Sequence, residues 1–215
     1  MPTLSLPKSG KTKADILESM RRARDKDAQW QNGKVFGLVY HISEEIDDLL
    51  KEAYTMFFSE NGLNPTAFPS LSKFENEIIA MASNLLGGDD KVAGTMTSGG
   101  TESLLMAVKT ARDYARAKRG ITNPEIILPS TAHPALDKAG EYFNVRMIHI
   151  PVRDDFRADV EAMRRAITPN TIMLVGSAPS YPHGVVDPIR ELAALAQEHG
   201  LLFHTDACVG GFMLP

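Results

Sequence analysis

Cysteine is almost absent from the sequence: Cys208 is the only one among 215 residues. A single cysteine excludes a disulfide within the chain and favours a reducing, cytoplasmic location, because structural disulfides belong to oxidising compartments. The first residues, MPTLSLPKSGKTK, contain no long apolar core and no small-residue cleavage pattern. We therefore predict neither a signal peptide nor a membrane-spanning helix.

An excess of basic charge is missing as well. The formal net charge is −4 and the pI is about 5.9, which argues against a surface built to neutralise a nucleic-acid backbone. The basic run MRRARDK at 20–26 includes an acidic residue and is typical of a solvated helix face. An apolar fraction of 43% and a charged fraction of 23% are ordinary for a globular protein.

The first part of the chain is helical in pattern. Apolar residues recur at helical spacing from Ile42 to Phe57, which predicts an amphipathic helix. A second helix is predicted to begin at Ser72, with Glu75 completing a capping box, and to stop at the glycine pair 87–88. We accordingly expect residues 1–88 to form a helical arm and residues 89–215 to belong to a larger domain.

Beyond residue 88, short β-rich runs alternate with helical patterns. This alternation predicts an α/β fold with a mostly parallel sheet covered by helices on both faces. The final residues, GGFMLP, follow a strand with no further helix or strand, so we expect this domain to be incomplete. The expected strands are 93–97, 125–129, 146–150, 171–177 and 201–207, and the expected helices are 102–118, 134–143, 160–167 and 188–199.

The stretch TSGGTES at 97–103 places two glycines directly before a helical pattern. Glycines let the backbone approach a ligand closely, and the unpaired amides at a helix start attract anions such as phosphate. Ser98 and Thr101 add hydroxyl donors. The stretch lacks the lysine of a Walker loop and the spacing of a dinucleotide fingerprint, so an ordinary capped helix start is the alternative interpretation.

Polar clusters also follow three predicted strands, as STAHP, SYPHG and HTDACVGG. In open parallel sheets ligands bind at the carboxyl ends of strands, so we expect these clusters to share one crevice. Several single residues here and in the helix after STAHP have a structural alternative. Asp206 can be a cap, His133 a solvated or helix-capping residue, Cys208 a buried filler and Lys138 a solvated charge. His204 and Asp206 share one side of their strand, but a metal site needs more than two ligands and none is predicted.

The order TSGGTES, STAHPALDKA, MRRAITPNTIMLVGSAPSYPHGVVDP, HTDACVGGF closely resembles the sphingosine-1-phosphate lyase family. These are pyridoxal-phosphate enzymes related to the group II amino-acid decarboxylases. The similarity begins at about NGKVFGLVYH and covers nearly the whole chain. It implies the large domain of a fold-type-I pyridoxal-phosphate enzyme and a homodimer with shared active sites.

The resemblance also implies roles for particular residues. The cofactor, pyridoxal 5'-phosphate, would be held at its phosphate by a cup, at its ring face by a stacked histidine and at its ring nitrogen by a carboxylate. These would be Ser98, Gly99, Gly100 and Thr101 for the cup, His133 for the stack, Asp206 for the ring nitrogen and Ala207 against the opposite ring face.

The implied substrate is a sphingoid-base phosphate, cleaved between C2 and C3 to phosphoethanolamine and a fatty aldehyde. Tyr40 and Asn61 match family positions near the substrate phosphate, and Tyr181 lies on a loop expected to face the same pocket. The chain departs from the family on this side, with FGLVY in place of Ser-Gly-Ala-Val-Tyr and NGLNP in place of Asn-Pro-Leu-His-Pro.

A lysine is missing from the implied machinery. The family binds its cofactor covalently through a lysine beyond the aspartate, and no lysine follows Asp206 here. We therefore expect this chain to be the N-terminal half of a lyase and to be inactive alone. An amino-acid decarboxylase on the same scaffold and a non-catalytic half-domain that binds the cofactor or a partner chain are the alternative interpretations.

Overall fold

The computed structural model describes residues 5–33, 35 and 37–215, and the chain forms two compact units, residues 1–60 and 61–215. The described strands all belong to the second unit. The predicted domain boundary after residue 88 stays a prediction. Helix α3 groups with the sheet-containing unit, where its Ile79 packs closely on Gly94.

The first unit consists of helices and connecting segments. Helix α2 starts after Ser43, whose hydroxyl accepts a hydrogen bond from the Ile46 amide at 3.3 Å. The predicted amphipathic helix is thereby confirmed. None of its residues is buried, so its apolar face is open in the described chain. The elements of this unit are α1 (Lys13–Arg24), a short 3-10 helix η1 (Trp30–Asn32) and α2 (Glu44–Met56).

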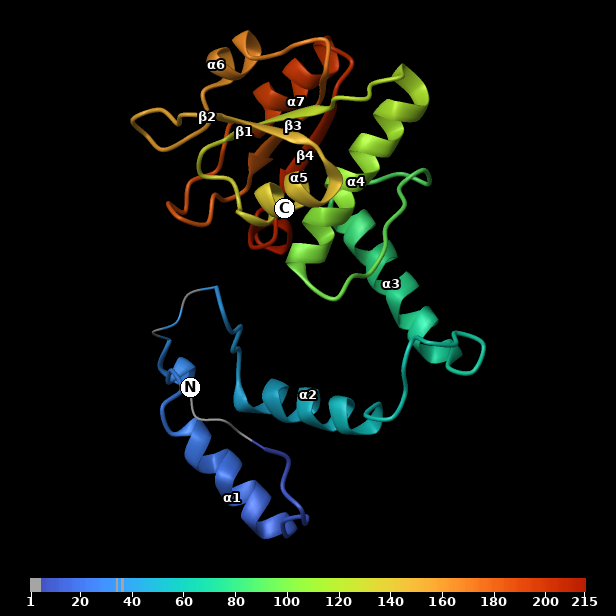
Figure 1. The fold of residues 1–215 in the computed structure, drawn as a ribbon, viewed down its shortest axis with the longest axis vertical. Helices are drawn as coiled ribbons and strands as arrows, with labels where there is room; N and C mark the ends of the chain where they lie inside the picture. Colours follow the sequence, from blue (N-terminus) through green and yellow to red (C-terminus); the bar gives the residue numbers. More distant parts are fainter. Residues whose placement is uncertain (1–4, 34, 36) are drawn as a thin grey trace. The chain divides into compact units, whose positions relative to one another are not determined.

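The second unit is built around a parallel sheet of four strands in the order β2-β1-β3-β4 (Figure 1). The predicted parallel sheet is confirmed. Its inner strands β1 and β3 are buried along their whole length, as expected for strands covered on both faces. The strands are β1 (Glu125–Pro129), β2 (Arg146–Ile150), β3 (Thr171–Ser177) and β4 (Leu202–Asp206).

Helices cover both faces of this sheet. Successive side chains of a strand point to opposite faces, so neighbouring residues pack against different helices. Ile126 and Leu128 pack in the cluster with α4 and α5, whereas Ile127 packs in the cluster with α6 and α7. The helices are α3 (Pro69–Leu85), α4 (Gly100–Arg119), α5 (Ala135–Phe143), α6 (Val160–Arg165) and α7 (Ile189–Glu198), and a 3-10 helix η2 (Gly210–Phe212) follows β4.

Two local predictions are wrong. Residues 93–97 form no strand, because no neighbouring strand in the described chain takes up their backbone groups. Helix α3 begins at Pro69 rather than at Ser72. A turn whose backbone amides bond to Asn64 leads into the helix, and Pro69, with its fixed φ, occupies the first helical turn.

A buried carboxylate ties the end of β3 to the loop before α6. Asp187 is 2% exposed, and its two oxygens accept hydrogen bonds from the amides of Ala158 and Ser177, both at 2.8 Å. The Asp187 amide in turn donates to the Ser177 carbonyl at 3.0 Å. These bonds fix the loop that leaves β3 at the carboxyl edge of the sheet.

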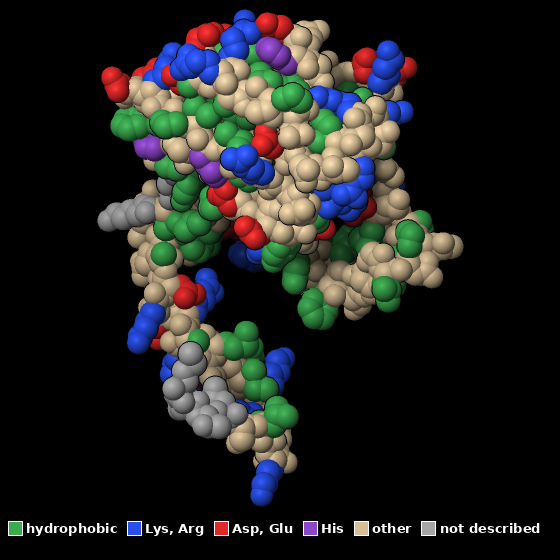
Figure 2. Space-filling view, turned by 45° about the horizontal axis from the view of Figure 1, so that its top comes forward, with side chains coloured by type: hydrophobic (Ala, Val, Ile, Leu, Met, Phe, Trp, Pro, Cys, Tyr) green, Lys and Arg blue, Asp and Glu red, His purple; other side chains and the backbone are tan. Residues whose placement is uncertain are grey.

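The surface is mixed in charge. On the face that Figure 2 presents, Lys and Arg side chains are interspersed with Asp and Glu. Such alternation is typical of a solvated surface. Among the described helices, none combines the length and apolar character needed to cross a bilayer.

We predict that Asp187→Ala in the full-length protein lowers the free energy of unfolding by about 2–5 kcal/mol, because two buried amides lose their acceptor. Urea denaturation measures the change. Asp154→Ala is the matched control, since Asp154 is an exposed aspartate in the same part of the chain. Equal stability of the two variants would contradict the role given to Asp187.

Candidate functional site

A cavity of about 460 Å³ opens at the carboxyl edge of the sheet. It is formed by the first turn of α4, the loop after β1 and the end of β4. Parallel strands end at the same edge of a sheet, so the polar residues that follow β1 and β4 come together there. The lining residues are Gly100, Thr101, Ser103, Leu104, His133, His204, Thr205, Asp206, Ala207 and Cys208.

The start of α4 supplies hydrogen-bond donors to this cavity. The Ser103 amide donates to the Gly99 carbonyl at 3.1 Å, which is the first bond of the helix. The amides of residues 100–102 precede this bond and have no acceptor within the helix. Together with the helix dipole they favour a negative group at this end of the cavity.

The segment before α4 is held by its own side chains. The Glu102 carboxylate accepts hydrogen bonds from both the amide and the hydroxyl of Ser98, each at 2.6 Å. The hydroxyls of Thr97 and Ser103 lie 2.7 Å apart. The Ser98 hydroxyl and amide are therefore engaged with Glu102 in this structure. These bonds to Ser98 also hold the pKa of the Glu102 carboxyl below its ordinary value of 4.5.

Asp206 brings a carboxylate to the same cavity lining. It is the last residue of β4 and pairs in register with Ser177 of β3. Its Oδ1 accepts a hydrogen bond from the Cys208 amide at 3.2 Å. The cavity lining includes no Lys or Arg among the described residues. The carboxylate can thus serve as the partner of a positively charged ligand atom.

His133 is oriented by the backbone that follows it. Its Nδ1 accepts a hydrogen bond from the Ala135 amide at 3.1 Å. In the neutral ring the proton then lies on Nε2, which leaves this nitrogen as a donor. The predicted alternative of a helix-capping histidine is therefore present in the structure, and the same ring also lines the cavity.

The structure brings part of the predicted site together and leaves part of it outside. Ser98 and Gly99 directly precede the lining residues of α4, and the exposed Asn61 folds its side chain back onto the Leu63 amide at 3.1 Å. Tyr40 belongs to the first unit, and Phe36, in the same FGLVY stretch, lies outside the described residues. The predicted residues that line the cavity are Gly100, Thr101, His133, Asp206 and Ala207, and those of the same unit that do not are Ser98, Gly99, Asn61 and Tyr181.

Several lining residues were not predicted as site residues. Ser103 and Leu104 follow Gly100 by one helical turn, so they share its side of α4. His204 lies two residues before Asp206 and therefore points to the same face of β4. This spacing was the available signal for His204, which the sequence suggested only as half of a metal site. In the described part of the chain, no three His, Cys, Asp or Glu side chains gather as metal ligands.

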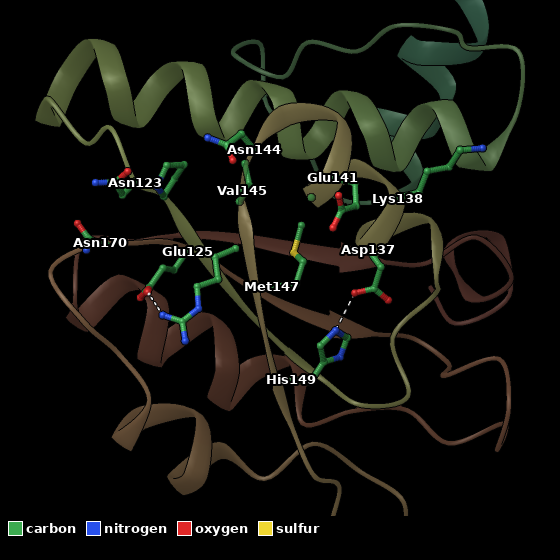
Figure 3. Close-up of a pocket in the computed structure, with 13 residues that line it drawn as sticks. Asn123, Glu125, Asp137, Lys138, Glu141, Asn144, Val145, Met147, His149 and Asn170 are labelled. Carbon is green, nitrogen blue, oxygen red and sulfur yellow. Dashed lines mark hydrogen bonds and ion pairs between the residues drawn. The ribbon is translucent and has the colours of Figure 1, made fainter.

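A second hollow, of about 830 Å³, lies along the edge strand β2 (Figure 3). Two polar contacts lie in it: a hydrogen bond between His149 Nε2 and Asp137 Oδ1 at 2.7 Å, and an ion pair between Arg146 Nη1 and Glu125 Oε1 at 3.1 Å. Figure 3 shows both pairs as contacts between side chains of the protein itself. Its residues are distinct from those of the cavity at the carboxyl edge.

The cavity at the carboxyl edge suits a small molecule with an anionic group and a cationic nitrogen. The free amides of α4 suit the anion, and the Asp206 carboxylate suits the nitrogen. Position 100 is open, because a Cβ built there meets only Cys208 Sγ, at 3.9 Å. A phosphorylated pyridine therefore fits the groups that this site offers.

Comparison with known proteins points to the same chemistry. The pyridoxal-dependent decarboxylase conserved domain matches residues 3–215. The sphingosine-1-phosphate lyase of Arabidopsis thaliana is 48% identical over 209 residues, which cover 94% of this chain and 38% of that protein. A probable L-aspartate decarboxylase of Pyrococcus furiosus is 34% identical, over 99% of this chain and 55% of that protein.

Among solved structures, the sphingosine-1-phosphate lyase of Burkholderia pseudomallei K96243 superposes with a TM-score of 0.92 and 38% identity. The match covers 99% of this chain and 51% of that structure. The chain therefore spans between about two fifths and about half of the length of these relatives.

We predict that an NMR titration finds the pKa of the Glu102 carboxyl below 4.5 and that Ser98→Ala raises it, because the serine hydroxyl stabilises the ionised form. Because the folded-state pKa is lowered, the stabilisation of this helix start by ionised Glu102 is present above pH 4.5. It is lost as the pH falls through the folded-state pKa. An unchanged Glu102 pKa in the Ser98→Ala variant would contradict the assignment.

Proposed function

Because the chain belongs to the pyridoxal-dependent decarboxylase family, we propose that the whole protein is a pyridoxal-phosphate-dependent lyase acting on sphingoid-base phosphates. The reaction would break the C2–C3 bond and give phosphoethanolamine and a fatty aldehyde. The observation that carries the proposal is the cavity lined both by the start of α4 and by Asp206. The amides of the helix start suit the phosphate of the family cofactor, and the carboxylate suits its ring nitrogen.

The residues of this chain would hold pyridoxal 5'-phosphate as follows. The phosphate would bind the amides at the start of α4 and the Thr101 hydroxyl, with Ser98, Gly99 and Gly100 shaping the loop. His133 would lie on one face of the ring and Ala207 on the other. These assignments agree with the resemblance of TSGGTES, STAHP and HTDACVGG to the family motifs.

When bound, pyridoxal phosphate supplies an electron sink for the charge that develops as a bond to the substrate amine carbon breaks. Asp206 would keep the ring nitrogen protonated, because a nearby negative charge favours the cationic form of a base. His133 would orient the ring and, with its free Nε2–H, could donate a proton at the reacting edge. Both side chains come from the carboxyl edge of the sheet.

The choice of a lyase over a decarboxylase is supported by the pattern of similarity. The Arabidopsis lyase is 48% identical, whereas the Pyrococcus decarboxylase is 34% identical. Release of carbon dioxide from a small amino acid is the alternative activity on this scaffold. Tyr40, Asn61 and Tyr181 stay the predicted substrate-binding residues.

A homodimer with shared active sites belongs to the same proposal and is supported by the resemblance. The exposed apolar face of α2 agrees with a subunit contact. A cytoplasmic location agrees with a single cysteine in the sequence, since reducing compartments disfavour disulfides.

The activity is tested with the full-length protein, pyridoxal phosphate and a sphingoid-base phosphate. We expect a long-chain aldehyde and phosphoethanolamine in equal amounts, as measured by mass spectrometry. A panel of amino acids assayed for carbon dioxide is the parallel arm. Release of carbon dioxide without aldehyde would favour the decarboxylase over the lyase. Formation of neither product would reject both activities.

We also predict that Gly100→Val in the full-length protein weakens pyridoxal phosphate binding at least about tenfold, because the branched side chain occupies space that the phosphate needs. The variant should fold, since the nearest atom to a Cβ at this position is Cys208 Sγ at 3.9 Å. Fluorescence titration of the apoprotein measures the affinity, and circular dichroism checks the fold. Unchanged affinity in a folded variant would show that the cofactor phosphate does not bind beside residue 100.

A further inference from the structure

His204 has a buried nitrogen that nothing in the described protein satisfies. Its Nε2 is fully buried and has no hydrogen-bond partner among the described residues. Buried polar atoms are normally paired, and an exception calls for an explanation. The same side chain lines the cavity at the carboxyl edge. The cavity lining therefore contains a second imidazole, besides that of His133, which takes no part in the proposed cofactor contacts.

His204 and Asp206 lie on the same face of β4. They are two residues apart on a regular strand, in register with Val175 and Ser177 of β3. Leu202, two residues earlier, packs in the cluster with α4 and α5, whereas Phe203 packs with α6 and α7. The alternation places His204 and Asp206 on the α4 side of the sheet.

An imidazole in this place has two possible effects on Asp206. A charged imidazolium would neutralise the carboxylate and compete with any cationic ligand. A neutral imidazole leaves the negative charge available. Burial lowers the pKa of the His204 imidazole below its ordinary value of 6.5, and the charge of Asp206 offsets part of this shift. Of the two forms, burial thus favours the neutral one at neutral pH.

The remaining lining residues include no Lys or Arg within the described chain. The other titratable side chains around the cavity are His133, at the loop before α5, and Cys208, after β4. The lining part of α4 contributes Gly100, Thr101, Ser103 and Leu104, which carry no charge. Within the described lining, the Asp206 carboxylate has no Lys or Arg beside it.

We infer that His204 is an uncharged positioning residue, which leaves the full negative charge of Asp206 for a cationic nitrogen heterocycle bound in the cavity. His204 acts through Asp206 and is not itself a catalytic residue. The inference depends on the proposed function for the identity of the heterocycle, pyridoxal phosphate. It adds a specificity rule: the site selects a ring with a protonated nitrogen because its own histidine carries no charge.

The test compares two ligands on the full-length apoprotein: pyridoxal phosphate and its carbocyclic analogue with CH in place of the ring nitrogen. Their affinity ratio reports the pairing of the ring nitrogen, because phosphate and aldehyde contacts are common to both. The variants are His204→Gln, which is neutral, and His204→Arg and His204→Lys, which add a cation. His149→Arg, at an exposed position of the edge strand β2, is the matched control, since His149 also pairs with a carboxylate, Asp137 (Figure 3).

We expect the native protein to prefer pyridoxal phosphate by about tenfold or more, because the pairing of opposite charges is lost with the analogue. His204→Gln and His149→Arg should keep this ratio. His204→Arg or His204→Lys should bring it close to one. A general packing defect would weaken both ligands alike and leave the ratio unchanged.

The other outcomes separate the inference from the proposed function. If Asp206→Asn keeps the native ratio, Asp206 does not pair with the ring nitrogen, and the assignment in the proposed function fails. If Asp206→Asn loses the ratio but the cationic His204 variants keep it, only the inference fails. Loss of the ratio in His204→Gln also overturns the inference, because charge would then not be the cause.

A measurement on the native protein covers the case in which the cationic variants do not fold. The ¹⁵N chemical shifts of the His204 imidazole at pH 7 distinguish the neutral ring from the imidazolium. The inference requires the neutral ring with and without pyridoxal phosphate. An imidazolium signal in either state would overturn it.

Discussion

The Asp206 carboxylate meets no Lys or Arg in the described lining of its cavity, and the first residues of α4 belong to the same lining. The proposed site depends on the presence of a carboxylate and a helix N-terminus in one cavity. Neither group alone defines a ligand. Together they suit one small molecule with an anion at one end and a cationic nitrogen at the other.

The sheet is what holds these two groups in place. The parallel register of β3 and β4 brings Asp206 level with Ser177, and the Ala178 amide donates to the Asp206 carbonyl at 2.8 Å. The Asp187 carboxylate then secures the chain that leaves β3. The same hydrogen bonds therefore stabilise the sheet and hold Asp206 in position.

Much of this arrangement could be predicted from the sequence, because its signals are local. Buried strands such as β3 contain a continuous apolar run, here residues 172–175, and polar residues directly after such strands must lie at the carboxyl edge. Features that depend on distant partners could not be predicted. Residues 93–97 have the composition of a strand but no bonded neighbour in the described chain. The burial of His204 Nε2 likewise depends on how helices pack over β4. The start of α3 at Pro69, by contrast, has local signals in the proline and the turn at Asn64, which the prediction of a start at Ser72 missed.

The most direct test of the central claim is a crystal structure of the full-length protein with pyridoxal phosphate bound. The account predicts that the phosphate accepts hydrogen bonds from the amides at the start of α4 and that the ring nitrogen lies within hydrogen-bond distance of the Asp206 carboxylate. A phosphate bound at another place, or a ring nitrogen paired with a different side chain, would contradict it.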